Sequence, residues 1–175
     1  MWPPGRKKNK TMNVLFVCTG NTCRSPMAET LMDDAVDRSR ILHGEVKIKS
    51  AGTFACEDAD PTEEAVRTME EMGLELEGHG AVQFTAELAV WADIILAMGK
   101  EQLEHMEVLA PEETGKMHTL LGYAQGVLGE PATSSYDIMD PFDEGMEEYR
   151  ACAQQLAKAV ELLVERLEHE FEDKA

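Results

Sequence analysis

One short stretch limits the possible folds of this chain more than any other. Residues 12–17 ("MNVLFV") form a continuous apolar run, which is typical of a parallel strand buried on both faces. The run enters Cys18 and a loop of small residues. Ser25 and Pro26 then open a helical pattern, since serine suits the N-cap and proline the first helical position. The sequence therefore predicts a strand, a tight loop and a helix, which is the repeating unit of an α/β domain.

Strands and helices alternate along the rest of the chain. Because strands separated by helices usually pair in parallel, we expect a parallel sheet with helices on both faces. The predicted strands are 12–17, 46–51, 93–98 and 116–120. Helices are predicted from Ser25 onward, over 61–72, after Thr85, over 99–109, after residue 120, and at the end of the chain. The last helix has one apolar face, which we expect to pack against the sheet: Tyr149, Ala153, Leu156, Val160, Leu163, Leu167 and Phe171.

Charge is distributed unevenly over the 175 residues. The net charge is −18, yet the first ten residues carry four Lys or Arg and no acid. So acidic a body is a poor partner for nucleic acid and is compatible with basic protein substrates. We expect a basic, flexible leader over residues 1–11 and a single domain over residues 12–175.

Several classes of protein are excluded by what the sequence lacks. No apolar segment follows the basic leader before the first strand, so it is not a secretory signal. No run approaches the roughly 18 apolar residues of a membrane span. The four cysteines have neither zinc-ligand spacing nor the density of a disulfide scaffold. We therefore expect a reduced, cytoplasmic protein, a monomer without metal or membrane contact.

The loop after the first strand has the composition of an anion-binding site. Between Cys18 and Arg24 lie five residues that are neither bulky nor acidic. A tight loop at a helix N-terminus turns its backbone N–H groups inward, and the arginine fork matches phosphate oxygens. The predicted phosphate-binding residues are Thr19, Gly20, Asn21, Thr22, Cys23, Arg24 and Ser25.

Cys18 at the start of this loop is the predicted nucleophile. Backbone donors, the helix dipole and a guanidinium can lower a cysteine pKa from about 8.5 into the range of about 3.5–7.5. Ser25 could donate a hydrogen bond to the resulting thiolate. The alternative is a buried, inert Cys18 with Arg24 in a surface salt bridge. A C-x5-R match alone is weak, but the strand, loop and helix around it favour phosphoryl transfer.

Phosphoryl transfer also needs an acid to protonate the leaving group. Residues 126–145 form a long Gly-, Pro- and Asp-rich segment, and long loops inside compact domains are usually functional or mobile. Asp140 in "DIMDPF" is the candidate acid, because Pro141 stiffens the chain after it. Asp137 is its nearest competitor, and an ordinary Asp-Pro turn is the alternative.

Four motifs now carry a resemblance: "VCTGNTCRSPMAE", "SAG" at residues 50–52, "ADIILAM" at residues 92–98 and "DPF" at residues 140–142. In this order they resemble the low-molecular-weight protein tyrosine phosphatase family, over roughly residues 12–171. The resemblance implies a three-layer αβα phosphatase fold, with a four-stranded parallel sheet in the flavodoxin-like order 2-1-3-4. It implies no metal or cofactor. Cys18 is then the nucleophile, Arg24 the phosphate clamp and Asp140 the general acid.

We expect substrate specificity to depend on Thr22 and Phe142. "CTGNTCRS" with "DPF" resembles the protein arginine phosphatase branch of the family, whereas tyrosine-directed members usually have an aliphatic residue at position 22 and tyrosines after Asp-Pro. Phe142 could stack on a planar guanidinium, and the acidic loop favours a cationic group. Asp143 and Glu144 depart from the branch, which has glycines there. We expect hydrolysis of phosphoarginine on proteins through a phosphocysteine; a tyrosine phosphatase is the alternative.

Two other functions stay open. An arsenate reductase of this fold would relay a disulfide through cysteines after the third strand, but "AMGKEQLEHMEVLA" has none. A binding module would hold a phosphorylated partner without hydrolysis, but it need not keep Asp140.

Cys23 adds a redox hypothesis to these alternatives. It lies in the same loop as Cys18, and a disulfide between the two would shield an oxidised Cys18 from irreversible oxidation. A small loop residue chosen for its size is the alternative.

Overall fold

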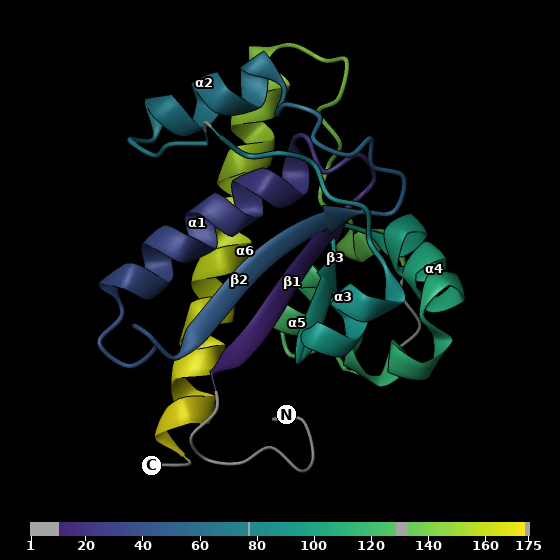
Figure 1. Cartoon of the computed structure of the whole chain (residues 1–175). Coiled ribbons are helices and arrows are strands. Elements are labelled where there is room, and N and C mark those ends of the chain that lie inside the picture. Colours follow the sequence, from purple (N-terminus) through teal and green to yellow (C-terminus); the bar gives the residue numbers. More distant parts are fainter. Residues whose placement is uncertain (1–10, 77, 129–132, 174–175) are drawn as a thin grey trace.

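The computed structural model describes residues 11–76, 78–128 and 133–173, so the predicted leader lies almost entirely outside the described residues. Its centre is a sheet of four parallel strands, in the order β2-β1-β3-β4 (Figure 1). This order confirms the prediction. The strands are β1 (Met12–Cys18), β2 (Val46–Gly52), β3 (Ile94–Ala97) and β4 (Met117–Thr119).

Helices cover both faces of this sheet (Figure 1). The face packed against α1 and α6 forms the larger of two apolar clusters, and α3 and α4 cover the other face. Two helical layers therefore enclose the sheet, which gives the three-layer αβα fold that was predicted. The helices are α1 (Arg24–Arg38), α2 (Glu63–Glu71), α3 (Ala86–Trp91), α4 (Lys100–Leu109), α5 (Leu120–Ala124) and α6 (Met146–Glu172), with 3-10 turns η1 (Pro111–Lys116) and η2 (Ser134–Tyr136).

The central position of strand β1 explains its apolar sequence. All seven of its residues are buried, since Val14 and Phe16 point into the α1–α6 cluster while Leu15 and Val17 point into the α3–α4 cluster. Successive side chains of a strand face opposite sides of the sheet, so a central strand covered on both sides is mostly apolar. Its buried polar residue, Asn13, donates from Nδ2 to the Trp91 carbonyl. The carboxyl end of this strand places Cys18 at the edge of the sheet.

Helix α6 also follows its predicted pattern. Six of the seven residues in the predicted stripe are buried, and Phe171, near the end of the helix, is partly buried. Burial of such a stripe is the main source of stability for a long amphipathic helix. No helix among the described residues is long and apolar enough to cross a membrane.

The predicted start of α1 is wrong by two residues. The N-cap is Cys23, and Arg24 is the first helical residue, so Ser25 and Pro26 lie inside the first turn. The serine hydroxyl does not cap the helix because it hydrogen-bonds elsewhere, to the Cys18 thiol and the Ala51 carbonyl. The other boundaries differ by one or two residues: α2 begins at Glu63 after the N-cap Thr62, and strands β3 and β4 are each shorter than predicted.

Candidate active site

The Cys18 sulfur lies at the start of the loop between β1 and α1, where it is almost completely buried. Its Sγ accepts a hydrogen bond from the Asn21 backbone N–H at 3.2 Å and lies 2.9 Å from the Ser25 hydroxyl. Backbone amide donors at a helix N-terminus favour negative charge. The segment after β1 therefore brings one backbone amide and one hydroxyl to the sulfur.

Asn21 holds this loop in shape. Its φ of 55° lies in the left-handed region, which asparagine tolerates better than most residues. Its side-chain Nδ2 donates to the Ser25 hydroxyl at 2.8 Å and to the Ser50 hydroxyl at 2.9 Å, while Oδ1 accepts from the Val82 backbone N–H at 2.9 Å. One buried amide thus connects the loop to helix α1, strand β2 and the segment before α3.

Three residues that were not predicted for the site extend this network: Ser50, Glu29 and His79. The Ser50 hydroxyl donates a short hydrogen bond to Glu29, and burial is the main cause of the raised pKa of that carboxyl. The His79 ring Nε2 lies 2.9 Å from the Asn21 carbonyl oxygen. Ser50 belongs to the "SAG" motif at residues 50–52, so the sequence offered a motif from which its role could have been predicted. His79 is 58 residues away from Asn21, and no local pattern marks it.

Gly52 at the end of β2 permits the close approach of the loop. A Cβ atom at this position would lie 2.3 Å from the Thr19 carbonyl oxygen and 2.9 Å from the Asn21 nitrogen. Both neighbours are backbone atoms, so they cannot move aside as a flexible side chain would. The glycine is therefore required by contact rather than by its own backbone conformation.

Arg24 presents a buried guanidinium next to this loop, with only 5% of the residue exposed. Its Nη1 donates to the Ile138 carbonyl at 3.1 Å, and its Nη2 donates to Asp140 Oδ2 at 3.2 Å. Among the described residues no group accepts a hydrogen bond from the buried Nε. A buried donor without a partner is costly, and an anion such as phosphate would satisfy it.

The two candidate acids occupy different places. Asp140 forms an ion pair with Arg24, and its side chain is 51% exposed at the edge of the site. Asp137 instead accepts a hydrogen bond from the Lys100 backbone N–H at 2.8 Å, at the start of α4. Between them, the Ile138 N–H donates to the Met98 carbonyl and anchors the loop to the end of β3. The structure therefore brings Asp140, rather than Asp137, to the arginine.

The two predicted specificity residues lie in different segments. Thr22 is partly exposed, and its backbone carbonyl accepts a hydrogen bond from the Thr62 N–H. Phe142 is 55% exposed, and its backbone N–H donates to Asp140 Oδ1. Asp143 has a φ of 60°, which a glycine would adopt without strain. The loop over residues 137–145, which carries Asp140 and is called the acid loop below, therefore contains a left-handed turn at Asp143.

Cys23 is buried in the α1–α6 cluster, and burial, followed by the neighbouring Cys18, raises the pKa of its thiol to about 12. Cys152 on α6 is buried in the same cluster, and burial raises its pKa to about 12 as well. All four cysteines carry free thiols in the structure. Cys23 and Cys152 are therefore protonated at neutral pH.

Comparison with known proteins gives one consistent result. The family model described as "Low molecular weight phosphotyrosine protein phosphatase" matches residues 13–173. A protein-arginine-phosphatase of Geobacillus stearothermophilus is 37% identical over 157 residues, which cover 90% of this chain and 97% of that protein. The tyrosine phosphatase Wzb of Escherichia coli K12 is 37% identical over 141 residues, which cover 79% of this chain and 84% of that protein.

A solved structure agrees with these sequence similarities. It is a cysteine-to-serine mutant of the arginine phosphatase YwlE with a phosphorylated active-site serine. Its TM-score is 0.80 at 32% identity, and the match covers 89% of this chain and 95% of that one. The fold and the family predicted from the sequence are both confirmed. This chain belongs to the low molecular weight phosphotyrosine protein phosphatase family.

Proposed function

We propose that this chain is a cysteine-dependent protein phosphatase that hydrolyses phosphoarginine on proteins. The observation that carries the proposal is the buried Arg24 guanidinium, which shares one loop with the buried Cys18 thiol and keeps its Nε without an acceptor among the described residues. A planar cation, backbone amide donors and a thiol together suit a phosphoryl group about to be transferred to sulfur. Family membership supports the same chemistry.

The first chemical step forms a phosphocysteine. The Cys18 thiolate attacks phosphorus, the S–P bond forms, and the P–N bond of phosphoarginine breaks. Asp140, which lies at the edge of the site beside Arg24, gives its proton to the departing guanidine nitrogen. The Asn21 N–H and the Ser25 hydroxyl, which already contact the sulfur, stabilise the thiolate before the attack.

The second step restores the thiolate. Asp140, now ionised, takes a proton from water, and the water oxygen attacks phosphorus while the S–P bond breaks. Cys18 leaves as a thiolate, for which the Ser25 hydroxyl at 2.9 Å is the hydrogen-bond donor, and inorganic phosphate is released. The same carboxyl group thus acts as general acid in the first step and as general base in the second.

Phosphoarginine is favoured over phosphotyrosine by the residues around the entrance. Asp140, Asp143 and Glu144 give the acid loop a negative charge that suits a guanidinium, and the exposed Phe142 ring offers a face for cation–π contact. The relative named a protein-arginine-phosphatase also matches more of the chain than Wzb does. A tyrosine phosphatase is the second candidate, because Wzb is equally identical over its shorter match.

The first prediction compares two peptides of the same sequence, one with phosphoarginine and one with phosphotyrosine. We expect kcat/KM to be higher for phosphoarginine, and Thr22→Ile to shift the ratio toward phosphotyrosine by about tenfold or more, because an aliphatic side chain favours an aromatic ring and adds no hydrogen bond. Cys18→Ser serves as the blank. A preference of the parent enzyme for phosphotyrosine would overturn the arginine assignment and leave the phosphatase chemistry intact.

The second prediction concerns the acid. Asp140→Asn removes the proton donor, so kcat on phosphoarginine peptides should fall about 10²–10⁴-fold. Asp143→Asn is the matched control, since it lies in the same exposed loop and asparagine also tolerates a positive φ. We expect the control to keep most of the kcat of the parent, while its KM rises because the loop loses one of the charges that suit a guanidinium. If both variants turn over substrate at the rate of the parent, Asp140 is not the acid.

The third prediction concerns oxidation. Peroxide converts the Cys18 thiolate to a sulfenic acid, the Cys23 sulfur then displaces water, and the S–S bond forms. Inactivation of the parent enzyme should therefore be reversed by dithiothreitol, whereas that of Cys23→Ser should become irreversible. Cys152→Ser is the control, because this thiol is equally buried and has a similar pKa. Equal recovery in all three proteins would rule out protection by Cys23.

We propose in addition that the enzyme acts as a monomer in the cytoplasm on phosphorylated proteins. The number and spacing of the four cysteines, which fit neither a disulfide scaffold nor a zinc site, support a reducing compartment. The mass in solution, measured by light scattering at several concentrations, tests the monomer directly.

A further inference from the structure

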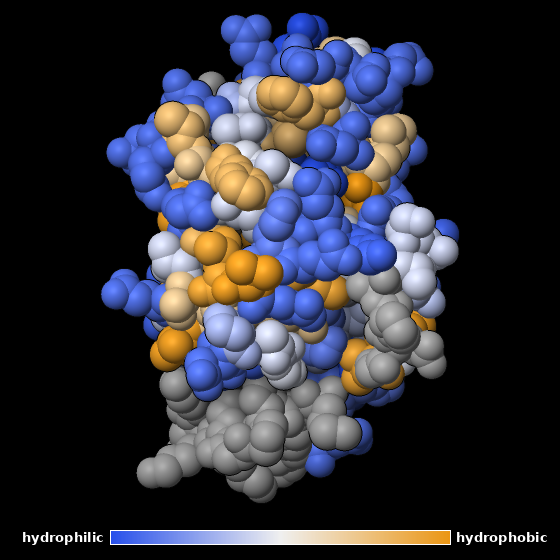
Figure 2. Space-filling view, turned by 90° about the vertical axis from the view of Figure 1, so that its right-hand side faces the viewer, coloured by the Kyte–Doolittle hydropathy of each residue, from blue (hydrophilic) through white to orange (hydrophobic). Residues whose placement is uncertain are grey.

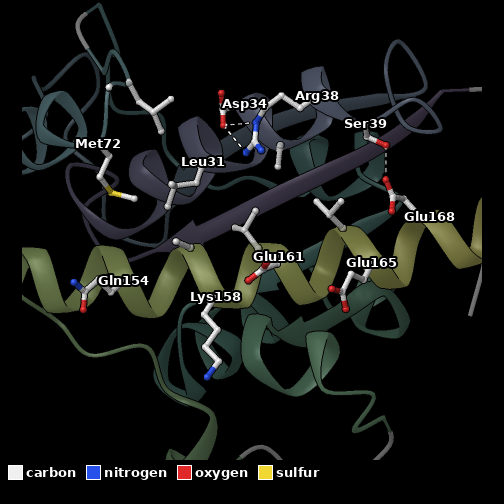
Figure 3. Close-up of a pocket in the computed structure, with 16 residues that line it drawn as sticks. Leu31, Asp34, Arg38, Ser39, Met72, Gln154, Lys158, Glu161, Glu165 and Glu168 are labelled. Carbon is white, nitrogen blue, oxygen red and sulfur yellow. Dashed lines mark hydrogen bonds and ion pairs between the residues drawn. The ribbon is translucent and has the colours of Figure 1, made fainter.

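A groove lies on the helical face that carries α1 and α6, along their lengths rather than at the Cys18 loop (Figure 3). It has a volume of about 890 Å³ and runs from the end of α2 down to the lower part of α6. Much of its floor is apolar: Leu31 and Ala35 from α1, Leu74, and Val160 and Val164 from α6. A floor of this kind favours an occupant with apolar side chains.

One edge of the groove is acidic. Glu161, Glu165 and Glu168 follow one another along α6 at +4 and +3 steps, so they share one side of the helix. Among the described residues no cation lies within ion-pair distance of Glu161 or Glu165. On the α1 side of the groove, Asp34 pairs with Arg38. Lys158 belongs to α6, and Figure 3 shows its side chain extending away from α1. The α6 edge therefore keeps a negative charge that an occupant could neutralise.

The chain itself contains a segment with the complementary composition. Residues 1–10 read "MWPPGRKKNK": four apolar residues come first, and four Lys or Arg occupy positions 6–10. Two consecutive prolines restrict the backbone to extended conformations, which lowers the entropy lost on binding. This segment lies outside the described residues.

The end of the groove is close to the point where this segment joins β1. Glu168 accepts a hydrogen bond from the Ser39 hydroxyl at 2.6 Å, and the same hydroxyl accepts from the Leu42 N–H at 3.0 Å. The Leu42 carbonyl accepts a hydrogen bond from the Glu45 backbone N–H, and the Glu45 carbonyl accepts one from the Met12 N–H at 2.7 Å. A short chain of hydrogen bonds thus connects the acidic end of the groove to the first residue of β1.

The order of residues in the segment matches the order of features in the groove. Starting from β1, the cations at positions 6–10 come first and would meet Glu168, Glu165 and Glu161, and Trp2 would reach the apolar part near Leu31 and Leu74. From residue 154 to residue 168 the α6 side of the groove is about 21 Å long, whereas ten extended residues span up to about 33–36 Å. The segment is therefore long enough.

We propose that residues 1–10 bind in the groove between α1 and α6 of the same chain, with their cations along the acidic edge and Trp2 on the apolar floor. The covalent connection at β1 gives the segment a high effective concentration, so weak contacts suffice to keep it bound. The leader then acts as a strap across the helical face, rather than as the free tail expected from its composition.

Tryptophan fluorescence tests this directly. The chain has two tryptophans, so Trp91→Phe leaves Trp2 as the only one. In this single-tryptophan protein at low salt, we expect a blue-shifted emission and weaker acrylamide quenching than for a peptide of residues 1–11. Adding Glu161→Lys and Glu165→Lys should shift the emission to the red and raise the quenching to that of the peptide. Glu107→Lys with Glu112→Lys makes the same charge change at exposed positions on α4 and η1, and should change nothing.

The outcomes separate the possible occupants. Trp2 as accessible in the single-tryptophan protein as in the peptide would overturn the proposal. Shielding that appears only at high protein concentration would also overturn it, since the occupant would then be the leader of a second copy. Salt gives an independent readout without the glutamate substitutions: because screening shortens the reach of the charges, about 1 M salt should expose Trp2, and shielding that salt leaves unchanged would contradict the role of the acidic edge.

Discussion

Replacement of Cys18 by serine is expected to lower kcat/KM on any phosphorylated substrate by about 10³-fold or more. A serine hydroxyl is not ionised at neutral pH, and neither one amide donor at 3.2 Å nor the Ser25 hydroxyl can make it so. The loop amides and Arg24 remain in place, however. We therefore expect Cys18→Ser to keep its affinity for inorganic phosphate, measured by isothermal titration calorimetry, while turnover is lost.

Cys23→Ser is the matched control for this experiment. It makes the same chemical change at a second buried thiol in the same loop, whose pKa of about 12 keeps it protonated. We expect its kcat/KM under reducing conditions to stay close to that of the parent enzyme. If Cys18→Ser keeps its turnover, or if Cys23→Ser loses as much as Cys18→Ser, the assignment of the nucleophile is wrong.

Gly52→Ala should be the most damaging substitution outside the reacting groups. The added methyl group would lie 2.3 Å from the Thr19 carbonyl oxygen, so the loop must move away from β2. Misplacement of a reacting group by about 1 Å can lower a rate about 10²-fold. We expect a loss of this size in kcat/KM, together with weaker phosphate binding. The unfolding midpoint should also fall, because overpacking in a close-packed interior costs about 1–3 kcal/mol.

Gly115→Ala provides the control for Gly52→Ala. A Cβ atom at position 115 has no heavy atom within 4 Å, so the same methyl group meets open space. Activity and unfolding midpoint should both match the parent protein. A fully active Gly52→Ala enzyme would show that β2 moves more easily than the loop, and that the contact does not fix the position of Cys18.

Local sequence patterns predicted the part of the site that is local in the chain. The strand, the loop and the helix lie within 27 residues, and each has its own signature: apolar side chains on β1, small residues in the loop and a helical pattern after it. The predicted N-cap, Ser25, was wrong because its hydroxyl has two possible hydrogen-bonding roles. Its hydroxyl could cap the helix or contact Cys18, and only the path of the loop decides between them.

The remaining contacts could not be predicted because they join distant segments. The Asn21 side chain reaches Ser50 and Val82, and its carbonyl meets His79, yet nothing in the local sequence marks these partners. The choice between Asp137 and Asp140 was likewise open from the residues alone. It depends on which carboxylate pairs with the Lys100 N–H at the start of α4 and which pairs with the Arg24 guanidinium. Both positions are set only when the sheet is assembled.

The ion pair between Arg24 and Asp140 has a consequence for substrate binding. A phosphoryl group entering the loop competes with an anion that the protein itself supplies, so binding is an exchange of partners at one guanidinium. With half of the Asp140 side chain in solvent, the internal pair contributes only about 0–1 kcal/mol. Between catalytic cycles, Asp140 therefore keeps the Arg24 guanidinium oriented through a weak ion pair. An incoming phosphate monoanion or dianion can displace the carboxylate from this pair.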